Sequence, residues 1–217
     1  MFFYLDIMDI NGLRNEFPQL SEQVYGKPLV YLDNAATSLR PLSVIRKWDE
    51  MSSKYTANLH RAVHYIANVA TAEYENSRKA VAAYLHAASP EEIVFTSGVT
   101  QSINLVAYSF GEAFIGPGDE IIVSEAEHHS DIVPWQLLCE RKGSVLKVLP
   151  VDDGGRLEIE KLDKLITGRT RIVCVTHVSN VLGLVNPVKS IVNICHSKGC
   201  LVLVDGAQGI VHCPVDV

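Results

Sequence analysis

The sequence contains no apolar stretch of the roughly 18–20 residues that a membrane-spanning helix requires. Its opening segment is apolar but carries Asp6 and Asp9 and no basic residue, so it lacks the pattern of a secretory signal peptide. No run of Lys or Arg occurs, and a formal charge of −6 is spread along the chain. These absences predict a cytoplasmic protein with no membrane and no nucleic acid among its partners.

Cysteine pairs with the spacing of metal or redox motifs are also absent, since no CxxC occurs. The five cysteines are Cys139, Cys174, Cys195, Cys200 and Cys213. An odd number suits a reducing compartment better than a disulfide framework, and we interpret most of them as small buried apolar residues. With 217 residues, 47% of them hydrophobic, the chain can form one sizeable core.

Short apolar segments alternate with segments of helical spacing. Six segments rich in β-branched residues are expected to be buried strands: Leu29–Asp33, Glu92–Thr96, Glu120–Ser124, Val145–Pro150, Arg171–Thr176 and Cys200–Asp205. Helices are expected at Ile66–His86, Glu158–Ile166 and Pro187–Lys198, and Gly199 after the last of them is expected to cap it. This order predicts an α/β fold with a mostly parallel sheet and helices on both faces.

Residues 1–29 lie outside this alternation. They contain Pro18 and a turn-like segment, Tyr25–Pro28, and we expect them to form an arm packed against the domain or a partner. Residues 30–217 are expected to form a single domain.

A candidate phosphate site follows the second of these predicted strands. The segment Thr96–Ser102 contains Gly98 and leads into a helix-like run, where unpaired N–H groups and the hydroxyls of Thr100 and Ser102 are possible donors to an anion. The same residues are also ordinary helix caps. No G-x-G-x-x-G follows an early strand, so a dinucleotide site lacks its main support.

Histidines and carboxylates stand together after the third strand, in the segment Ser124–Asp131. They are compatible with metal ligands, with acid–base groups or with a solvated loop. Because His128 and His129 are adjacent in sequence, their side chains tend to point apart. Zinc is therefore the third choice, and we predict no metal site.

Two further strand ends carry polar residues. The loop Thr176–Asn180 can present an amide to a ligand, and Asp205 follows an apolar strand and precedes glycine. A carboxylate in such a place is either a cap or arginine partner, or a fixed anion that faces a bound cation.

Four segments resemble, in order, the signatures of class V (fold type I) enzymes that use pyridoxal 5′-phosphate (PLP). They are Tyr31–Ser38, Glu127–Gln136, Thr176–Gly183 and Val204–Gln208. The second segment is similar to that of SUF-type cysteine desulfurases and selenocysteine lyases. The resemblance covers the chain from about Leu13 to Val217 and implies the large PLP-binding domain of this fold.

The resemblance implies a role for several residues. Thr100 and the backbone of Val99 would hold the cofactor phosphate, and His128 would stack on the pyridine ring and shuttle protons as the catalytic residue. Asp205 would pair with the pyridine nitrogen. Gln208 would contact the phenolic oxygen of the cofactor.

Two further roles come from the same resemblance. Asn180 would lie near the phenolic oxygen and the substrate carboxylate. His60 and Arg61 resemble a loop that reaches the neighbouring active site in homodimers of the family.

The family also has residues for which this sequence shows no counterpart. They are the lysine of a Ser-Gly-His-Lys motif, which binds the cofactor covalently, a persulfide-forming cysteine and a carboxylate-binding arginine. No lysine follows Lys198. The sequence therefore resembles an N-terminal part without the C-terminal small domain, and we expect it to be inactive as given.

Two classes of function follow. The first is part of a cysteine desulfurase that acts on L-cysteine and supplies sulfur to an acceptor protein for iron–sulfur cluster assembly, or a selenocysteine lyase or other class V enzyme. The second is a non-catalytic protein that binds PLP or a partner chain.

Overall fold

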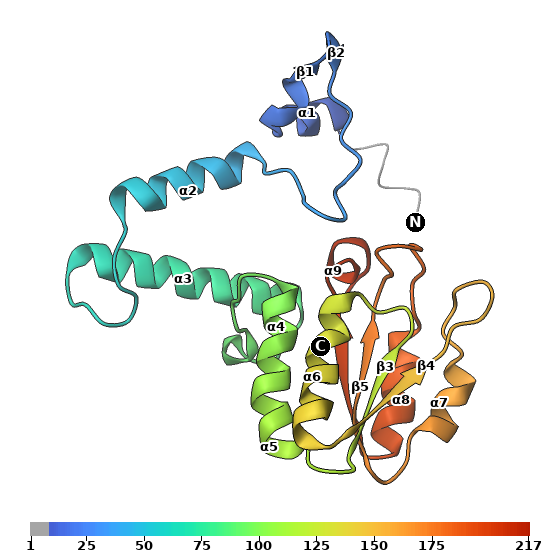
Figure 1. The fold of residues 1–217 in the computed structure, drawn as a ribbon. Coiled ribbons are helices and arrows are strands. Elements are labelled where there is room, and N and C mark those ends of the chain that lie inside the picture. Colours follow the sequence, from blue (N-terminus) through green and yellow to red (C-terminus); the bar gives the residue numbers. More distant parts are fainter. Residues whose placement is uncertain (1–8) are drawn as a thin grey trace. The chain divides into compact units, whose positions relative to one another are not determined.

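The computed structural model describes residues 9–217, which form two compact units (Figure 1). Unit 1 extends to Tyr84 and includes Ala88–Pro90, and unit 2 comprises Leu85–Ala87 and Glu91–Val217. The expected boundary at residue 29 between arm and domain stays a prediction.

Unit 1 is largely helical. Its elements are α1 (Ile10–Asn15), the 3-10 turn η1 (Pro18–Ser21), the short antiparallel strands β1 (Gln23–Val24) and β2 (Lys27–Pro28), α2 (Leu42–Lys54) and α3 (Tyr65–Tyr84). Tyr25 and Gly26 join β1 to β2 with positive φ angles of 54° and 73°, as a tight two-residue hairpin requires. The helix predicted from Ile66 is confirmed as α3.

The strand predicted at Leu29–Asp33 is wrong. This segment is irregular, and the side chains of Val30 and Leu32 are 75% and 89% exposed. An apolar, β-branched sequence becomes a strand only where a second strand accepts its hydrogen bonds, and the described residues of unit 1 place none beside it.

Unit 2 is an α/β layer structure. Its elements are η2 (Pro90–Glu92, which begins in unit 1), α4 (Val99–Val106), the π-helical η3 (Ala107–Gly111), α5 (Glu112–Phe114), β3 (Glu120–Ser124), η4 (His129–Asp131), α6 (Val133–Lys142), β4 (Val145–Leu149), α7 (Ile159–Leu165), β5 (Thr170–Thr176), α8 (Val188–Ser197), β6 (Leu201–Asp205) and α9 (Gly209–His212). The four longer strands form one parallel sheet in the order β4-β3-β5-β6. The predicted α/β class and parallel sheet are confirmed.

Apolar residues cover both faces of the sheet because successive strand residues point to opposite sides. Ile121 and Val123 of β3 pack in one cluster with Trp135 and Leu138 of α6 and with residues of α4 and η3. Ile122 belongs to a second cluster with residues of α7 and α8. Figure 1 shows these helices on the two sides of the sheet, as predicted.

The strand predicted at Glu92–Thr96 is wrong, and α8 ends at Ser197, one residue before the predicted end. Residues 93–96 are irregular, with Ile93 buried and Val94 64% exposed, and they do not join the sheet. Lys198 caps α8, and Gly199 follows with a φ of 74°, a left-handed conformation that favours glycine. None of the described helices combines the length and the apolar character needed to cross a membrane.

Candidate cofactor and active site

The carboxyl ends of β3, β5 and β6 lie along one edge of the sheet, where open parallel sheets bind ligands. This edge carries the segments that follow Ser124, Thr176 and Asp205. The segments that carry His128 and Asp205 do not follow neighbouring strands, because β5 lies between β3 and β6. Strand order depends on how the chain crosses over, which the strand sequences do not specify.

The turn before α4 has the form of an anion site. Gly98 is the N-cap residue with φ 151° and ψ 174°, and no atom lies within 4 Å of the position that a Cβ would take there. The first N–H groups of the helix, including those of Val99 and Thr100, have no intrahelical acceptor. Ser102 does not supply the additional donor that the sequence suggested, because its hydroxyl lies 2.8 Å from the Thr96 hydroxyl within the turn.

Thr100 and His128 line the same pocket, which has a volume of about 300 Å³. The lining residues are Thr100, Asn104, His128, His129, Ser130, Val133, Pro134 and Leu137. Because α4 and the segment after β3 both reach this pocket, it combines a helix N-terminus with an exposed imidazole. The sequence predicted both residues for one ligand, and the structure brings them together.

The ring of His128 has a defined orientation. The backbone N–H of Ser130 donates to its Nδ1 at 3.2 Å, and the Ser130 hydroxyl lies 2.8 Å from the same nitrogen. Because Nδ1 accepts from a backbone N–H, a neutral ring carries its proton on Nε2. His129 lies with its ring at 76° to that of His128. Within residues 9–217, no three potential metal ligands gather at one point.

Asp205 is buried at the end of β6, with 5% of its surface exposed. The N–H of Ala207 donates to its Oδ1 at 2.8 Å, so the carboxylate closes the turn that follows the strand. It has no ion-pair partner in the described part of the chain, so the arginine alternative finds no support there.

Asn180 and Gln208 lie in the loops after β5 and β6. Asn180 is exposed in a turn where the Ser179 hydroxyl accepts from the N–H of Leu182 at 3.1 Å. Gln208 is half-buried and is the N-cap residue of α9. Neither lines the pocket of Thr100 and His128.

His60 and Arg61 lie in unit 1, in the loop between α2 and α3. His60 has a φ of 60°, its N–H donates to the Thr71 hydroxyl at 3.1 Å, and its Nε2 lies 3.2 Å from a Glu75 carboxylate oxygen. Arg61 is exposed. The loop is therefore held by α3, and its role across a subunit interface stays a prediction.

The sequence singled out the carboxylates beside His128 but assigned them no individual role. Glu127 is 9% exposed and Asp131 is fully buried, so the solvated-loop interpretation is wrong for these two residues. Glu127 Oε1 accepts from the N–H of Thr176 at 2.7 Å and from the Ser124 hydroxyl. Asp131 Oδ1 accepts from Trp135 Nε1 at 2.9 Å. Burial raises the pKa of both carboxyls.

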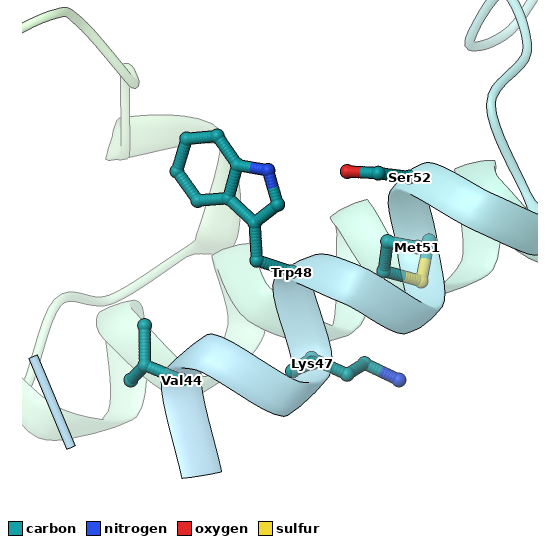
Figure 2. Close-up of a pocket in the computed structure, with 5 residues that line it drawn as sticks. All are labelled: Val44, Lys47, Trp48, Met51 and Ser52. Atoms are coloured by element: carbon teal, nitrogen blue, oxygen red, sulfur yellow. The ribbon is translucent and has the colours of Figure 1, made fainter. Parts of the chain in front are cut away.

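A second pocket, of about 380 Å³, lies on α2 in unit 1 (Figure 2). It is lined by Val44, Lys47, Trp48, Met51 and Ser52. Trp48 is 63% exposed, and the one charged group, Lys47, lies 2.9 Å from Glu73 and 3.3 Å from Glu50. The pocket therefore offers an apolar surface and one neutralised cation, which gives it no candidate chemistry.

Residues 30–217 match the family model described as aminotransferase class-V. The chain belongs to this family. It is 47% identical over 210 residues to a probable cysteine desulfurase of Halalkalibacterium halodurans, covering 97% of this chain and 52% of that protein. It is 48% identical over 209 residues to a cysteine desulfurase of Dickeya dadantii, covering 96% and 50%. The chain thus spans about half the length of these curated relatives.

Solved structures of the family agree with the fold. The cysteine desulfurase CsdA of Escherichia coli superposes with a TM-score of 0.86 at 39% identity, over 97% of this chain and 52% of that one. The apo cysteine desulfurase of Thermococcus onnurineus gives a TM-score of 0.87 at 40% identity, over 96% and 50%. The family membership and the fold that the sequence predicted are confirmed.

Proposed function

We propose that this chain is the N-terminal part of a PLP-dependent cysteine desulfurase, an enzyme that converts L-cysteine to L-alanine and passes the sulfur to an acceptor protein for iron–sulfur cluster assembly. The observation that carries the proposal is the pocket in which the N-terminus of α4, through Thr100, meets the imidazole of His128. The similarity to proteins named cysteine desulfurase supports the reaction and the substrate. In this proposal residues 1–29 are an arm, and residues 30–217 belong to the large domain.

The residues at the sheet edge fit PLP by their chemistry. The open turn at Gly98 and the first N–H groups of α4 suit a phosphate, with Thr100 as a hydroxyl donor. The buried Asp205 suits a protonated pyridine nitrogen, since a buried carboxylate requires a positive or hydrogen-bonding partner. When bound, PLP supplies an electron-accepting ring for bonds at the substrate Cα.

The chain contributes binding and proton transfer at this site. Because the Ser130 N–H donates to Nδ1 of His128, a neutral ring carries its proton on Nε2, the nitrogen left for proton transfer. The N–H of Ala207 holds Oδ1 of Asp205 at the end of β6, where the carboxylate can face a cation. Asn180 is exposed and offers an amide to a substrate carboxylate.

The lysines of unit 2 support an inactive chain. None follows the carboxyl end of a strand, and four pair with carboxylates: Lys147 with Glu120 at 2.8 Å, Lys198 with Asp163 at 2.7 Å, Lys142 with Glu112 at 3.4 Å, and Lys161 with Glu158. A lysine that binds a cofactor covalently has to be desolvated and uncharged beside it. We propose that these residues alone give no desulfurase activity.

The cysteines support the same conclusion. Burial raises the pKa of Cys139, Cys174 and Cys200, and it raises that of Cys195 to about 12. The thiolate is the nucleophile that takes up sulfur, so these four thiols are poor acceptors. The fifth, Cys213, is half-buried beyond α9.

The test is incubation of the 217-residue protein with PLP and L-cysteine. PLP should bind saturably, alanine should form no faster than with PLP alone, and borohydride should not fix PLP to one specific lysine. The variant Asp205→Asn should bind PLP more weakly, whereas Asp153→Asn, in an exposed turn after β4, should not. Catalytic alanine formation together with labelling of one lysine would overturn the proposed inactivity. Absence of PLP binding would overturn the proposal that PLP is the cofactor.

Two alternatives are separated by the same assay. The paired lysines favour a protein that binds PLP without chemistry, and this would show as binding with no product from any amino acid. A selenocysteine lyase part, once joined to its remaining half, would act on L-selenocysteine in preference to L-cysteine.

A further inference from the structure

The carboxyl groups of Glu127 and Asp131 connect three elements around the segment that carries His128. Glu127 reaches the end of β5 through the N–H of Thr176 at 2.7 Å, and Asp131 reaches α6 through Trp135 Nε1 at 2.9 Å. The two carboxyls also lie within hydrogen-bonding reach of each other. His128 therefore lies between two anchored acidic residues.

One oxygen of each carboxyl lacks a donor. Glu127 Oε2 and Asp131 Oδ2 are buried and have no hydrogen-bond partner among the described residues. Leaving a buried polar atom unpaired is unfavourable, and two buried carboxylates in contact repel each other strongly. A single proton between the two groups removes both problems, because it gives one oxygen a donor and leaves one negative charge instead of two.

We propose that Glu127 and Asp131 share one proton and act as a positioning pair that holds the His128 segment against β5 and α6. The pair does not line the pocket, so it acts on the ligand through His128. Its role towards PLP rests on the proposed function, whereas the shared proton and the anchored segment do not.

The groups around the pair favour the protonated state. Burial is the main reason that the pKa of each carboxyl is raised, and the charge of Asp205 adds to this for Asp131. From β5, Cys174 faces the pair as a buried thiol whose own pKa is raised, so it adds no charge. Ser124, Thr176 and Trp135 are neutral, and neither carboxyl forms an ion pair in residues 9–217.

Amide variants test the shared proton because an amide mimics a protonated carboxyl. In Asp131→Asn, Oδ1 can still accept from Trp135 while Nδ2 donates to Glu127. In Glu127→Gln, Oε1 keeps its two donors while Nε2 donates to Asp131. The double variant Glu127→Gln/Asp131→Asn places two NH₂ groups face to face, so it should unfold more readily than either single variant predicts.

Infrared difference spectra at neutral pH measure the proton directly. The C=O band of a protonated carboxyl should disappear in each single amide variant, because the remaining carboxyl then accepts from an amide and is ionised. A band that persists in Asp131→Asn, or additive stabilities in the double variant, would overturn proton sharing.

Hydrogen exchange of the peptide that contains residues 125–135 tests the positioning role without a ligand. Asp131→Ala and Glu127→Ala should exchange at least roughly tenfold faster in this peptide than the wild type, while the amide variants should stay near it. The matched control is Ser109→Ala, which removes a hydroxyl bond to Leu105 elsewhere in unit 2. Equal exchange in alanine and amide variants would overturn the anchoring.

PLP binding then separates this inference from the proposed function. Asp131→Ala should bind PLP more weakly by roughly tenfold, and Asp131→Asn should restore the affinity. If neither the wild type nor any variant binds PLP but the infrared and exchange results are as expected, the proposed function is wrong and the proton-sharing pair is still supported. If PLP binds equally to the alanine and amide variants, the pair does not position His128.

Discussion

Raising the pH from about 5 to about 7 is expected to lower the free energy of unfolding of unit 2, because the folded protein retains a proton that the unfolded chain releases. Burial raises the pKa of the Glu127 and Asp131 carboxyls above the value of about 4 in an unfolded chain, and the proposed pair retains one proton between them. A carboxyl with a raised pKa contributes stability fully below its unfolded pKa and loses it as the pH rises through the folded pKa.

The magnitude follows from one retained proton. Each pH unit in this window costs about 1.4 kcal/mol, so two units cost about 3 kcal/mol. The lowered pKa values of Glu112, Asp119 and Glu120 act in the opposite direction, but their contribution is complete above about pH 5. For a urea dependence of about 1–3 kcal/mol per molar, the midpoint should fall by at least about 1 M.

The assay is urea unfolding followed by the fluorescence of Trp135, which donates to Asp131 and therefore reports on this site. The sequence has two tryptophans, so Trp48→Phe in unit 1 makes Trp135 the only one. Asp131→Asn in the same background should flatten the pH dependence. A wild-type midpoint that stays constant or rises over this range would refute the reasoning, and a slope of twice the expected size would show two retained protons instead of one.

Two further predictions concern the ligand and assembly. Thr100→Val should weaken PLP binding by roughly tenfold, because one hydrogen bond to the charged phosphate is lost. Absorbance titration measures the affinity, with Ser109→Ala as the control, and an unchanged affinity would place the phosphate elsewhere. Sedimentation at micromolar concentration should show a homodimer. Arg61→Glu should weaken this dimer, whereas Lys189→Glu, at an exposed residue of α8, should leave it intact. A monomeric wild type would leave the loop of His60 and Arg61 without its proposed role.

The buried strands could be predicted from the sequence because each is an apolar run bounded by polar or turn residues. Glu120–Ser124 is a strand over its whole predicted length, and the last strand begins one residue later than predicted, at Leu201. Leu29–Asp33 and Glu92–Thr96 have the same composition but do not form strands. The difference is the presence of a pairing partner, which a local pattern cannot report.

The sequence indicated individual candidate residues of the site but not how these residues are arranged in space. The family resemblance assigned Thr100 and His128 to one ligand, and both line one pocket although the strand predicted before Thr100 does not form. The strand order, with β5 between β3 and β6, is a tertiary property and was missed. Burial of Glu127 and Asp131 was missed for the same reason. It depends on Thr176, which lies at the end of another strand, and on Trp135, which lies on the next helix.

The position of β5 has a chemical consequence for the whole edge. By lying between β3 and β6, it brings the Thr176 N–H to Glu127 and keeps the acidic residues after β3 one strand away from Asp205. Were both Glu127 and Asp131 ionised, three buried carboxylates would face this edge, and none of them forms an ion pair within residues 9–217. A shared proton removes one of these charges, and the N–H groups of Thr176, Trp135 and Ala207 stabilise the others. In the proposed function Asp205 faces a cationic ring and the N-terminus of α4 holds a phosphate, so one edge of the sheet would bind opposite charges at separate points.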